Sequence, residues 1–236
     1  MTTDILHEQK ILILDFGSQY TQNIARKVRE FQIYCEIHPC TLTFEEIKTI
    51  NAKGIILSGG PASVQEKDSP LCDPRLFELG FPILGICYGM QLITHLFGGK
   101  VDSSPNREFG SAELMLNEFS DMFEEVKNNS IVWMSHGDRI SKLPTGFKGI
   151  ASTNNSPLAA IENSSEKIYG LQFHPEVVHT IEGTKILKNF LFKICECSQN
   201  WKMESLIEYM IKDIQDKVKN SKVVCGLSGG VDSSVA

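Results

Sequence analysis

Cys87 is the residue whose surroundings in this sequence most favour covalent chemistry. It lies where a short apolar run, residues 82–86, gives way to a segment with helical periodicity, residues 88–97. Such apolar runs are typical of strands buried on both faces of a parallel sheet. Gly85 and Gly89 flank Cys87 and allow a sharp turn. A thiol there meets the free N–H groups of a helix N-terminus, which favour the thiolate. We therefore predict a nucleophile elbow with a surface thiol, the alternative being a buried structural cysteine.

His174 and Glu176 form the second group that suits catalysis. They follow the apolar segment 167–173 and enclose Pro175, which enforces an extended path. Residues two apart on an extended chain project to the same side, so the carboxylate can orient the imidazole and stabilise its charged form. With Cys87, these residues predict a nucleophile, a base and an orienting acid. Taken alone, a His-Pro-Glu segment carries no function.

Two polar loops are predicted at the ends of other apolar strands. Ser58-Gly59-Gly60-Pro61 follows a strand at 54–57, and its glycines allow backbone N–H groups to point into the crevice beyond the strand. Beside a nucleophile this loop is a candidate donor to an oxyanion, although Gly-Gly also occurs in ordinary turns. Residues 134–138 are predicted to form a polar turn after a strand at 131–134, with His136 either a candidate base or a solvated loop residue.

The elements that must position these residues indicate an α/β fold. In the first half, apolar strands alternate with helices, which favours a largely parallel sheet. Strands are predicted at 11–14, 34–38, 54–57 and 82–86, and helices at 20–31, from 43, at 74–79 and at 88–97. The second half has strands at 107–116, 131–134, 149–153, 158–161 and 167–173, then a helix at 180–195. The predicted fold class is a mostly parallel open sheet flanked by helices, with an antiparallel extension.

A second domain is predicted to begin at the polar break Ser198-Gln199-Asn200. We expect residues 1–198 to form the first domain, and residues 199–236 to supply a linker helix at 203–219 and a strand at 222–227. A loop of glycine and serine follows, formed by Ser228, Gly229, Gly230, Val231, Asp232, Ser233 and Ser234. Such a loop between a strand and a helix suits a phosphate group, although a lone Gly-Ser turn has the same composition. It lacks the Gly-Lys-Ser/Thr ending of a Walker loop.

The composition excludes several classes of protein. A chain of 236 residues with 42% hydrophobic content can bury a sizeable core. Its formal net charge of −6 argues against a general nucleic-acid binder. The 7 cysteines have no Cys-x-x-Cys spacing, which fits a reducing compartment and predicts no metal site. The N-terminus has no apolar signal segment and no run reaches membrane-spanning length, so we expect a cytoplasmic protein.

The elbow, the Ser58–Pro61 loop and the His-Pro-Glu segment, in this order, resemble the motifs of the class I glutamine amidotransferases over about residues 10–197. The resemblance implies that Cys87 attacks the side-chain amide of glutamine, that His174 transfers protons and that Glu176 orients His174. It implies an oxyanion hole formed by the backbone N–H groups of Gly60 and Tyr88. The implied glutamine pocket is bordered by Gly59, Gln91, Ser135, Gly137 and Asp138. Glutamine hydrolysis of this kind needs no cofactor.

The loop at 228–234 resembles the pyrophosphate-binding loop of the ATP pyrophosphatases, which implies that it binds ATP with Mg²⁺. An amidotransferase followed directly by such a loop resembles enzymes that convert XMP into GMP with ATP and with ammonia from glutamine. The resemblance implies glutamine, XMP and ATP as small-molecule substrates, no nucleic-acid or membrane partner, and a full-length homodimer. The rest of the nucleotide domain, with the XMP site, is then expected beyond Ala236.

Two other functions stay open at this point. One is an amidotransferase subunit that serves anthranilate, aminobenzoate or CTP synthesis, which the loop at 228–234 disfavours. The other is a non-catalytic, glutamine-sensing domain, which the intact Cys87, His174 and Glu176 disfavour. Glutamine hydrolysis by the wild type but not by a Cys87→Ala variant would distinguish catalysis from sensing.

Overall fold

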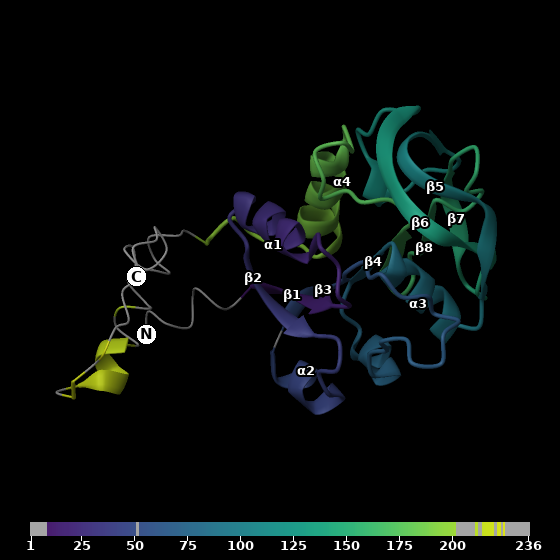
Figure 1. Ribbon diagram of the computed structural model, residues 1–236. Coiled ribbons are helices and arrows are strands. Elements are labelled where there is room, and N and C mark those ends of the chain that lie inside the picture. Colours follow the sequence, from purple (N-terminus) through teal and green to yellow (C-terminus); the bar gives the residue numbers. More distant parts are fainter. Residues whose placement is uncertain are drawn as a thin grey trace.

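The computed structural model describes residues 9–50, 52–201, 211, 214–219, 221, 222 and 224. Its centre is a mixed sheet with the strand order β2-β1-β3-β4-β9-β8-β7-β5-β6 (Figure 1). The strands are β1 (Lys10–Asp15), β2 (Tyr34–Pro39), β3 (Ala52–Leu57), β4 (Ile83–Ile86), β5 (Lys100–Leu116), β6 (Ser130–Lys142), β7 (Lys148–Ser152), β8 (Ala160–Asn163) and β9 (Ile168–Leu171). The helices are α1 (Thr21–Glu30), α2 (Phe44–Ile50), α3 (Tyr88–Leu96) and α4 (Gly183–Asn189), with short 3-10 helices η1 (Pro74–Leu79) and η2 (Asp121–Phe123) and a π-helical segment η3 (Phe190–Ile194).

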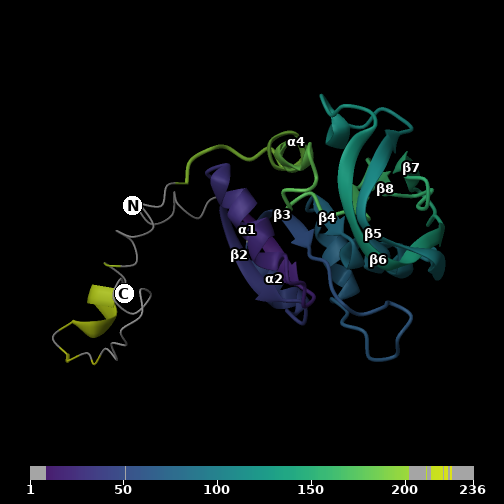
Figure 2. The ribbon, with the colours of Figure 1, turned by 45° about the horizontal axis from the view of Figure 1, so that its top comes forward.

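The first half of the sheet is parallel and buried on both faces. β1 pairs with β2 and β3, and β3, β4 and β9 continue the parallel arrangement. Helices α1 and α4 cover one face, whereas α2 and α3 cover the other (Figures 1 and 2). Alternate residues of β1 therefore enter different cores: Ile11 joins the core that contains Ile24 of α1, and Leu12 joins the core that contains Ile47 of α2. This double burial explains why the strand segments are uniformly apolar.

The second half of the sheet is antiparallel and runs through β9, β8, β7, β5 and β6. β5 begins at Lys100 rather than at 107, and β6 continues to Lys142 rather than ending at 134. The prediction of a polar turn at 134–138 is wrong, because these residues lie within β6. They stay extended since β5 pairs with them, with Glu108 opposite His136. The predicted α/β fold, a sheet flanked by helices with an antiparallel extension, is confirmed, and the sheet is mixed because its antiparallel part is as large as its parallel part.

The segment after β9 carries the predicted base and its orienting acid. β9 ends at Leu171, two residues before the predicted end. The helix predicted at 180–195 begins at Gly183 and changes to π-helical hydrogen bonding at Phe190. A Cβ atom on Gly183 would overlap the carbonyl oxygen of Pro175. Only glycine therefore lets the start of α4 pack this closely against the segment that holds His174 and Glu176.

The turn from β4 into α3 is strained at Cys87. Its backbone angles, φ 52° and ψ −104°, lie outside the regions that residues with a side chain favour. Two glycines let the chain pass close to itself here. A Cβ atom on Gly85 would lie 2.5 Å from the carbonyl carbon of Gly89, and a Cβ atom on Gly89 would overlap the carbonyl oxygen of Leu57 in β3. The sharp strand-to-helix turn is as the sequence predicted.

Part of the predicted second domain lies outside the described residues. Residues 211 and 214–218 are helical, within the helix predicted at 203–219. The predicted phosphate loop at 228–234 and most of the strand predicted at 222–227 are outside the described residues. In the part of the chain that the structure describes, no helix is long and apolar enough to cross a bilayer. The same residues contain no group of three or more His, Cys, Asp or Glu side chains that could hold a metal ion.

Replacing Gly89 by alanine is expected to destabilise the protein, because the new methyl group would overlap the carbonyl group of Leu57. Overpacking of this kind costs about 2–3 kcal/mol, which lowers the melting temperature by about 5–10 °C in a chain of this size. Scanning calorimetry measures the change. Gly137→Ala is the control, since its new Cβ atom would lie 3.7 Å from the nearest atom, Nε of Arg107. An unchanged melting temperature for Gly89→Ala would contradict the close approach of α3 to β3.

Candidate active site

Cys87 lies at the carboxyl end of β4, in the middle of the sheet. Its N–H group donates to the carbonyl oxygen of Leu171 over 2.7 Å, so the elbow is tied to the last residue of β9. Because parallel strands end at the same edge, β4 and β9 bring Cys87 and the segment after Leu171 together. Cys87 is 5% exposed. The expectation of a surface thiol is wrong, because Gly59 and Ser135 of β6 pack against it.

His174 and Glu176 form a buried pair beside this elbow. Nδ1 of His174 lies 2.8 Å from Oε1 of Glu176, and the two side chains are 4% and 0% exposed. The main chain of His174 is fixed at both of its polar groups. Its N–H donates to the carbonyl of Trp133 in β6, and its carbonyl accepts from the hydroxyl group of Thr180 over 2.6 Å. The contact between imidazole and carboxylate that the sequence predicted is therefore present. The extended path predicted at Pro175 is wrong, because the chain turns at Pro175 and Glu176.

The charge on His174 is set by opposing effects. Burial disfavours the imidazolium and lowers its pKa, but the carboxylate of Glu176 and a hydrogen bond with the side chain of Cys87 raise it. The net effect raises the pKa of His174 to about 10. His174 therefore carries its proton at neutral pH. Since Nδ1 faces Glu176, Nε2 is the nitrogen left for the sulfur of Cys87.

Gln172 is a further residue of this site, which the sequence analysis did not single out. Its side chain is fully buried, and its Nε2 donates to Sγ of Cys87 over 3.7 Å. The carbonyl oxygen of Ser135 lies 3.6 Å from the same sulfur. The sequence does hold one indication of Gln172. It is a polar residue in an apolar strand segment, and it lies two residues before His174, on the same side of the predicted strand.

The residues expected to form the oxyanion hole lie next to the nucleophile. A Cβ atom on Gly59 would lie 3.2 Å from Cε1 of His174 and 3.7 Å from Cβ of Cys87, and Gly60 follows at the edge of the same hollow. Tyr88 is the first residue of α3, where N–H groups have no partner within the helix. Its hydroxyl group donates to a backbone carbonyl elsewhere, so Tyr88 faces the site through its backbone. These positions fit donors from Gly60 and Tyr88.

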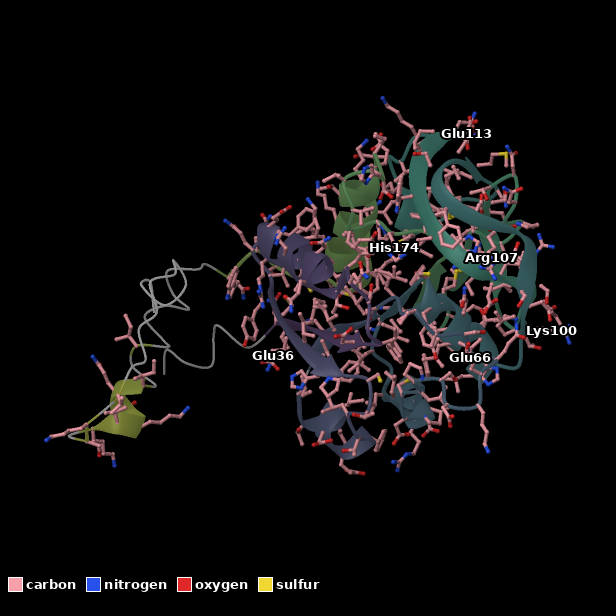
Figure 3. The ribbon with its side chains drawn as sticks, viewed as in Figure 1. Glu36, Glu66, Lys100, Arg107, Glu113 and His174 are labelled. Atoms are coloured by element: carbon pink, nitrogen blue, oxygen red, sulfur yellow. The ribbon has the colours of Figure 1, made fainter. Side chains whose placement is uncertain are left out.

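Two hollows in the described structure meet at Cys87. The larger has a volume of about 610 Å³ and reaches towards β5 and β6. Its lining includes Glu66, Gln91, Arg107, Ser135, Gly137 and Asp138. Four of these are among the five residues predicted to border glutamine; the fifth, Gly59, lies instead beside His174 and Cys87. The smaller, of about 270 Å³, is lined by His174 and the loop at 17–20. Figure 3 shows His174 near the middle of the molecule, with Arg107 on the side of β5.

A buried polar cluster supports the wall that β5 and β6 form. Nε2 of His136 lies 3.2 Å from Oε2 of Glu108, and hydroxyl groups of Thr153 and Ser156 also donate to this carboxylate. Nδ1 of His136 lies 2.9 Å from the carbonyl oxygen of Asp138. Burial lowers the pKa of His136, although Glu108 opposes the effect. The view of His136 as a solvated loop residue is wrong. Both ring nitrogens are engaged, so His136 supports the pocket and does not serve as the base.

Comparison with known proteins extends these observations. Residues 12–194 match the family model of the class-I glutamine amidotransferases. A glutamine-hydrolysing GMP synthase of Caldanaerobacter subterraneus subsp. tengcongensis is 56% identical over 231 residues, which cover 98% of this chain and 45% of that protein. The GMP synthase of Brachyspira hyodysenteriae is 57% identical over 227 residues, which cover 96% of this chain and 44% of that protein. The chain thus spans slightly less than half the length of these curated relatives.

A solved structure adds a likeness in fold. It is that of a putative GMP synthase subunit from Thermoplasma acidophilum, which is similar to this chain with a TM-score of 0.70 and 30% sequence identity. The match covers 89% of this chain and 98% of that one. Nearly the whole of the Thermoplasma protein therefore corresponds to the mixed sheet and helices described above.

Replacing Glu176 by glutamine is expected to lower the pKa of His174 from about 10 to the ordinary value of histidine or below it. The neutral amide keeps an acceptor for Nδ1, but it removes the negative charge that mainly offsets the effect of burial on the pKa. An NMR titration of the histidine rings measures the change. His95, which is exposed on α3, is the internal control. A pKa that stays near 10 in the variant would show that Glu176 does not set the charge of His174.

The substitution Glu176→Gln is also expected to lower the free energy of unfolding, by an amount that depends on pH. A histidine whose pKa is raised in the folded state stabilises the fold below its unfolded pKa of about 6.5, and this contribution is lost as the pH rises through about 10. The loss of unfolding free energy in Glu176→Gln should therefore be largest near pH 6 and should shrink as the pH approaches 10. Urea denaturation at a series of pH values measures it. A difference that grows with pH would contradict this sign.

Proposed function

The chain belongs to the class-I glutamine amidotransferase family, and on this basis we propose that it hydrolyses the side-chain amide of glutamine at Cys87. The observation that supports this most directly is the position of Cys87 at a strained helix start, next to the buried pair of His174 and Glu176. A protonated imidazole beside the sulfur favours the thiolate, which is the nucleophilic form of cysteine. The larger hollow has room for an amino acid, and Cys87 lies at its edge.

The proposed reaction proceeds in two stages through a covalent intermediate. The thiolate of Cys87 attacks the amide carbon of glutamine and forms a tetrahedral oxyanion. Backbone N–H groups of Gly60 and Tyr88 stabilise this oxyanion, and one preorganised donor contributes about 3–4 kcal/mol. His174 gives its proton to the leaving nitrogen, so ammonia departs and a γ-glutamyl thioester remains. His174 then takes a proton from water, whose oxygen attacks the thioester, and glutamate leaves as the thiolate returns. Glu176 keeps the ring oriented and stabilises its charged form.

We further propose that the ammonia serves the amination of a nucleotide. The relatives that match this chain at 56% and 57% identity are named glutamine-hydrolysing GMP synthases. By analogy, the whole protein converts XMP, ATP, glutamine and water into GMP, AMP, pyrophosphate and glutamate. In this proposal residues 1–198 form the glutaminase domain, and residues 199–236 begin the nucleotide domain.

ATP belongs to the second domain in this proposal. The loop from Ser228 to Ser234 is assigned to its phosphates, because backbone N–H groups of a glycine-rich loop suit an anion. ATP with Mg²⁺ supplies the activation of the C2 oxygen of XMP as an adenylate, which ammonia displaces. We propose that the whole protein is a cytoplasmic homodimer, and its unpaired cysteine spacing fits a reducing compartment.

Replacing Cys87 by alanine is expected to lower the rate of glutamate release from glutamine by more than about a thousandfold, because the sulfur that forms the proposed thioester is removed. Circular dichroism should show an unchanged fold. Cys40→Ala, which removes a buried thiol elsewhere, is the control and should keep the wild-type rate. Full activity in Cys87→Ala would refute the proposal.

A glutamine analogue that carries an electrophile is expected to label Cys87 and none of the other cysteines. Burial raises the pKa of Cys35 to about 11 and that of Cys72 to about 12, so these thiols stay protonated at neutral pH. Mass spectrometry of the digested protein identifies the labelled residue. Glutamine that binds without hydrolysis or labelling would favour a sensing domain instead.

The chain of 236 residues by itself is expected to form no GMP and to release glutamate slowly, at a rate that XMP plus ATP leaves unchanged. Nucleotides can raise the rate only by binding one state of the protein more tightly than another, and the proposed ATP loop is a small part of such a site. Glutamate release with and without both nucleotides is the measurement. Stimulation by several-fold would mean that this chain contains a working nucleotide site, against the proposed domain division.

A further inference from the structure

We propose that the side-chain amide of Gln172 stabilises the Cys87 thiolate as a fixed hydrogen-bond donor. The inference rests on the proposed reaction at Cys87, and it adds a group that belongs neither to the His174–Glu176 pair nor to the oxyanion hole. Nε2 of Gln172 donates to Sγ of Cys87 over 3.7 Å. Gln172 is fully buried, so water does not compete for this contact.

The direction of the Gln172 amide is fixed by its other contact. Its Oε1 accepts a hydrogen bond from Nε2 of Gln91 over 3.3 Å. Since the oxygen faces a donor, the NH₂ group must face the remaining partner, which is the sulfur of Cys87. Gln91 is itself held, because its Nε2 also donates to the carbonyl oxygen of Asp138 over 3.1 Å. A continuous series of contacts thus connects the wall of the larger hollow to the nucleophile.

The neighbours of the Cys87 sulfur favour opposite protonation states of the thiol. The carbonyl oxygen of Ser135, at 3.6 Å, accepts a hydrogen bond from the thiol and would repel a thiolate. The N–H group of Gln172 has the reverse preference, because a hydrogen bond to a charged acceptor is stronger than one to a neutral acceptor. His174 donates to the sulfur only while it is protonated, and it loses its proton to the leaving group during the reaction. Gln172 is neutral, so it remains a donor at every stage of the reaction. Its hydrogen bond offsets the repulsion between the carbonyl oxygen of Ser135 and the thiolate.

The substitution Gln172→Met tests the proposal, because methionine fills a similar volume without an N–H group. Alkylation of Cys87 by iodoacetamide, followed by mass spectrometry of its peptide, reports the thiolate without glutamine or turnover. We expect the pH of half-maximal alkylation to rise relative to the wild type, and the rate measured below that pH to fall by about tenfold for each unit of the rise. Gln172→Glu is a second variant that keeps an acceptor for Gln91. We expect a larger loss there, since a carboxylate would repel the thiolate.

Asn189→Leu is the matched control. Asn189 is also a buried amide, but it donates to the backbone carbonyl groups of Met122 and Glu124, away from the site. Circular dichroism and the melting temperature establish that each variant is folded. In steady-state assays of glutamine hydrolysis, Gln172→Met should lower kcat about tenfold and leave KM within about twofold.

Two results would overturn the proposal. One is wild-type alkylation, with an unchanged pH dependence, in folded Gln172→Met and Gln172→Glu. The other is an equal loss of alkylation in Asn189→Leu. A loss confined to the Gln172 variants supports the proposal even if the wild-type chain fails to hydrolyse glutamine, a failure that would count against the proposed function alone.

Discussion

The parallel pairing of β4 with β9 is the constraint on which the site depends. Beyond the last pair of this ladder, the N–H group of Cys87 donates to the carbonyl oxygen of Leu171. The same register places Gln172 and His174, which follow Leu171 in the chain. A slip of β9 by one residue would exchange the faces of this segment and turn Phe173 towards the sulfur. The core on the side of α1 and α4 resists such a slip, because Leu171 and Phe173 are fully buried in it. Hydrophobic packing therefore fixes the position of polar groups that contribute little to the core themselves.

The buried charges of His174 and Glu176 depend on each other. One carboxylate oxygen contacts the ring, while the other, Oε2, has no hydrogen-bond partner among the described residues. A buried carboxylate with an unsatisfied oxygen is costly unless an opposite charge lies next to it. The imidazolium supplies that charge, and the same charge favours the thiolate of Cys87. One arrangement thus makes the burial of Glu176 tolerable and activates the sulfur.

The features that the sequence predicts well are the local ones. Flanking glycines specify the turn at Cys87. The contact between the imidazole of His174 and the carboxylate of Glu176 also lies within three residues of sequence, although the chain turns there and is not extended. The length of β6 is not local, since residues 134–138 are polar enough for a turn and stay extended only because β5 pairs with them. His136 is buried for the same reason, with its partner Glu108 on the other strand. The role of Gln172 was missed because it depends on a contact between distant parts of the chain.

The central place of β9 also determines when the sulfur acquires its neighbours during folding. Gln172 and Cys87 are 85 residues apart in the sequence, and β9 enters the sheet between β4 and β8. Contacts between such distant segments form later than local helices and hairpins, because the entropy of loop closure opposes them. During synthesis Cys87 precedes His174, so its thiol has no base until β9 enters the sheet. A partly folded chain therefore carries an unactivated cysteine, and the reactive sulfur exists only once the domain is complete.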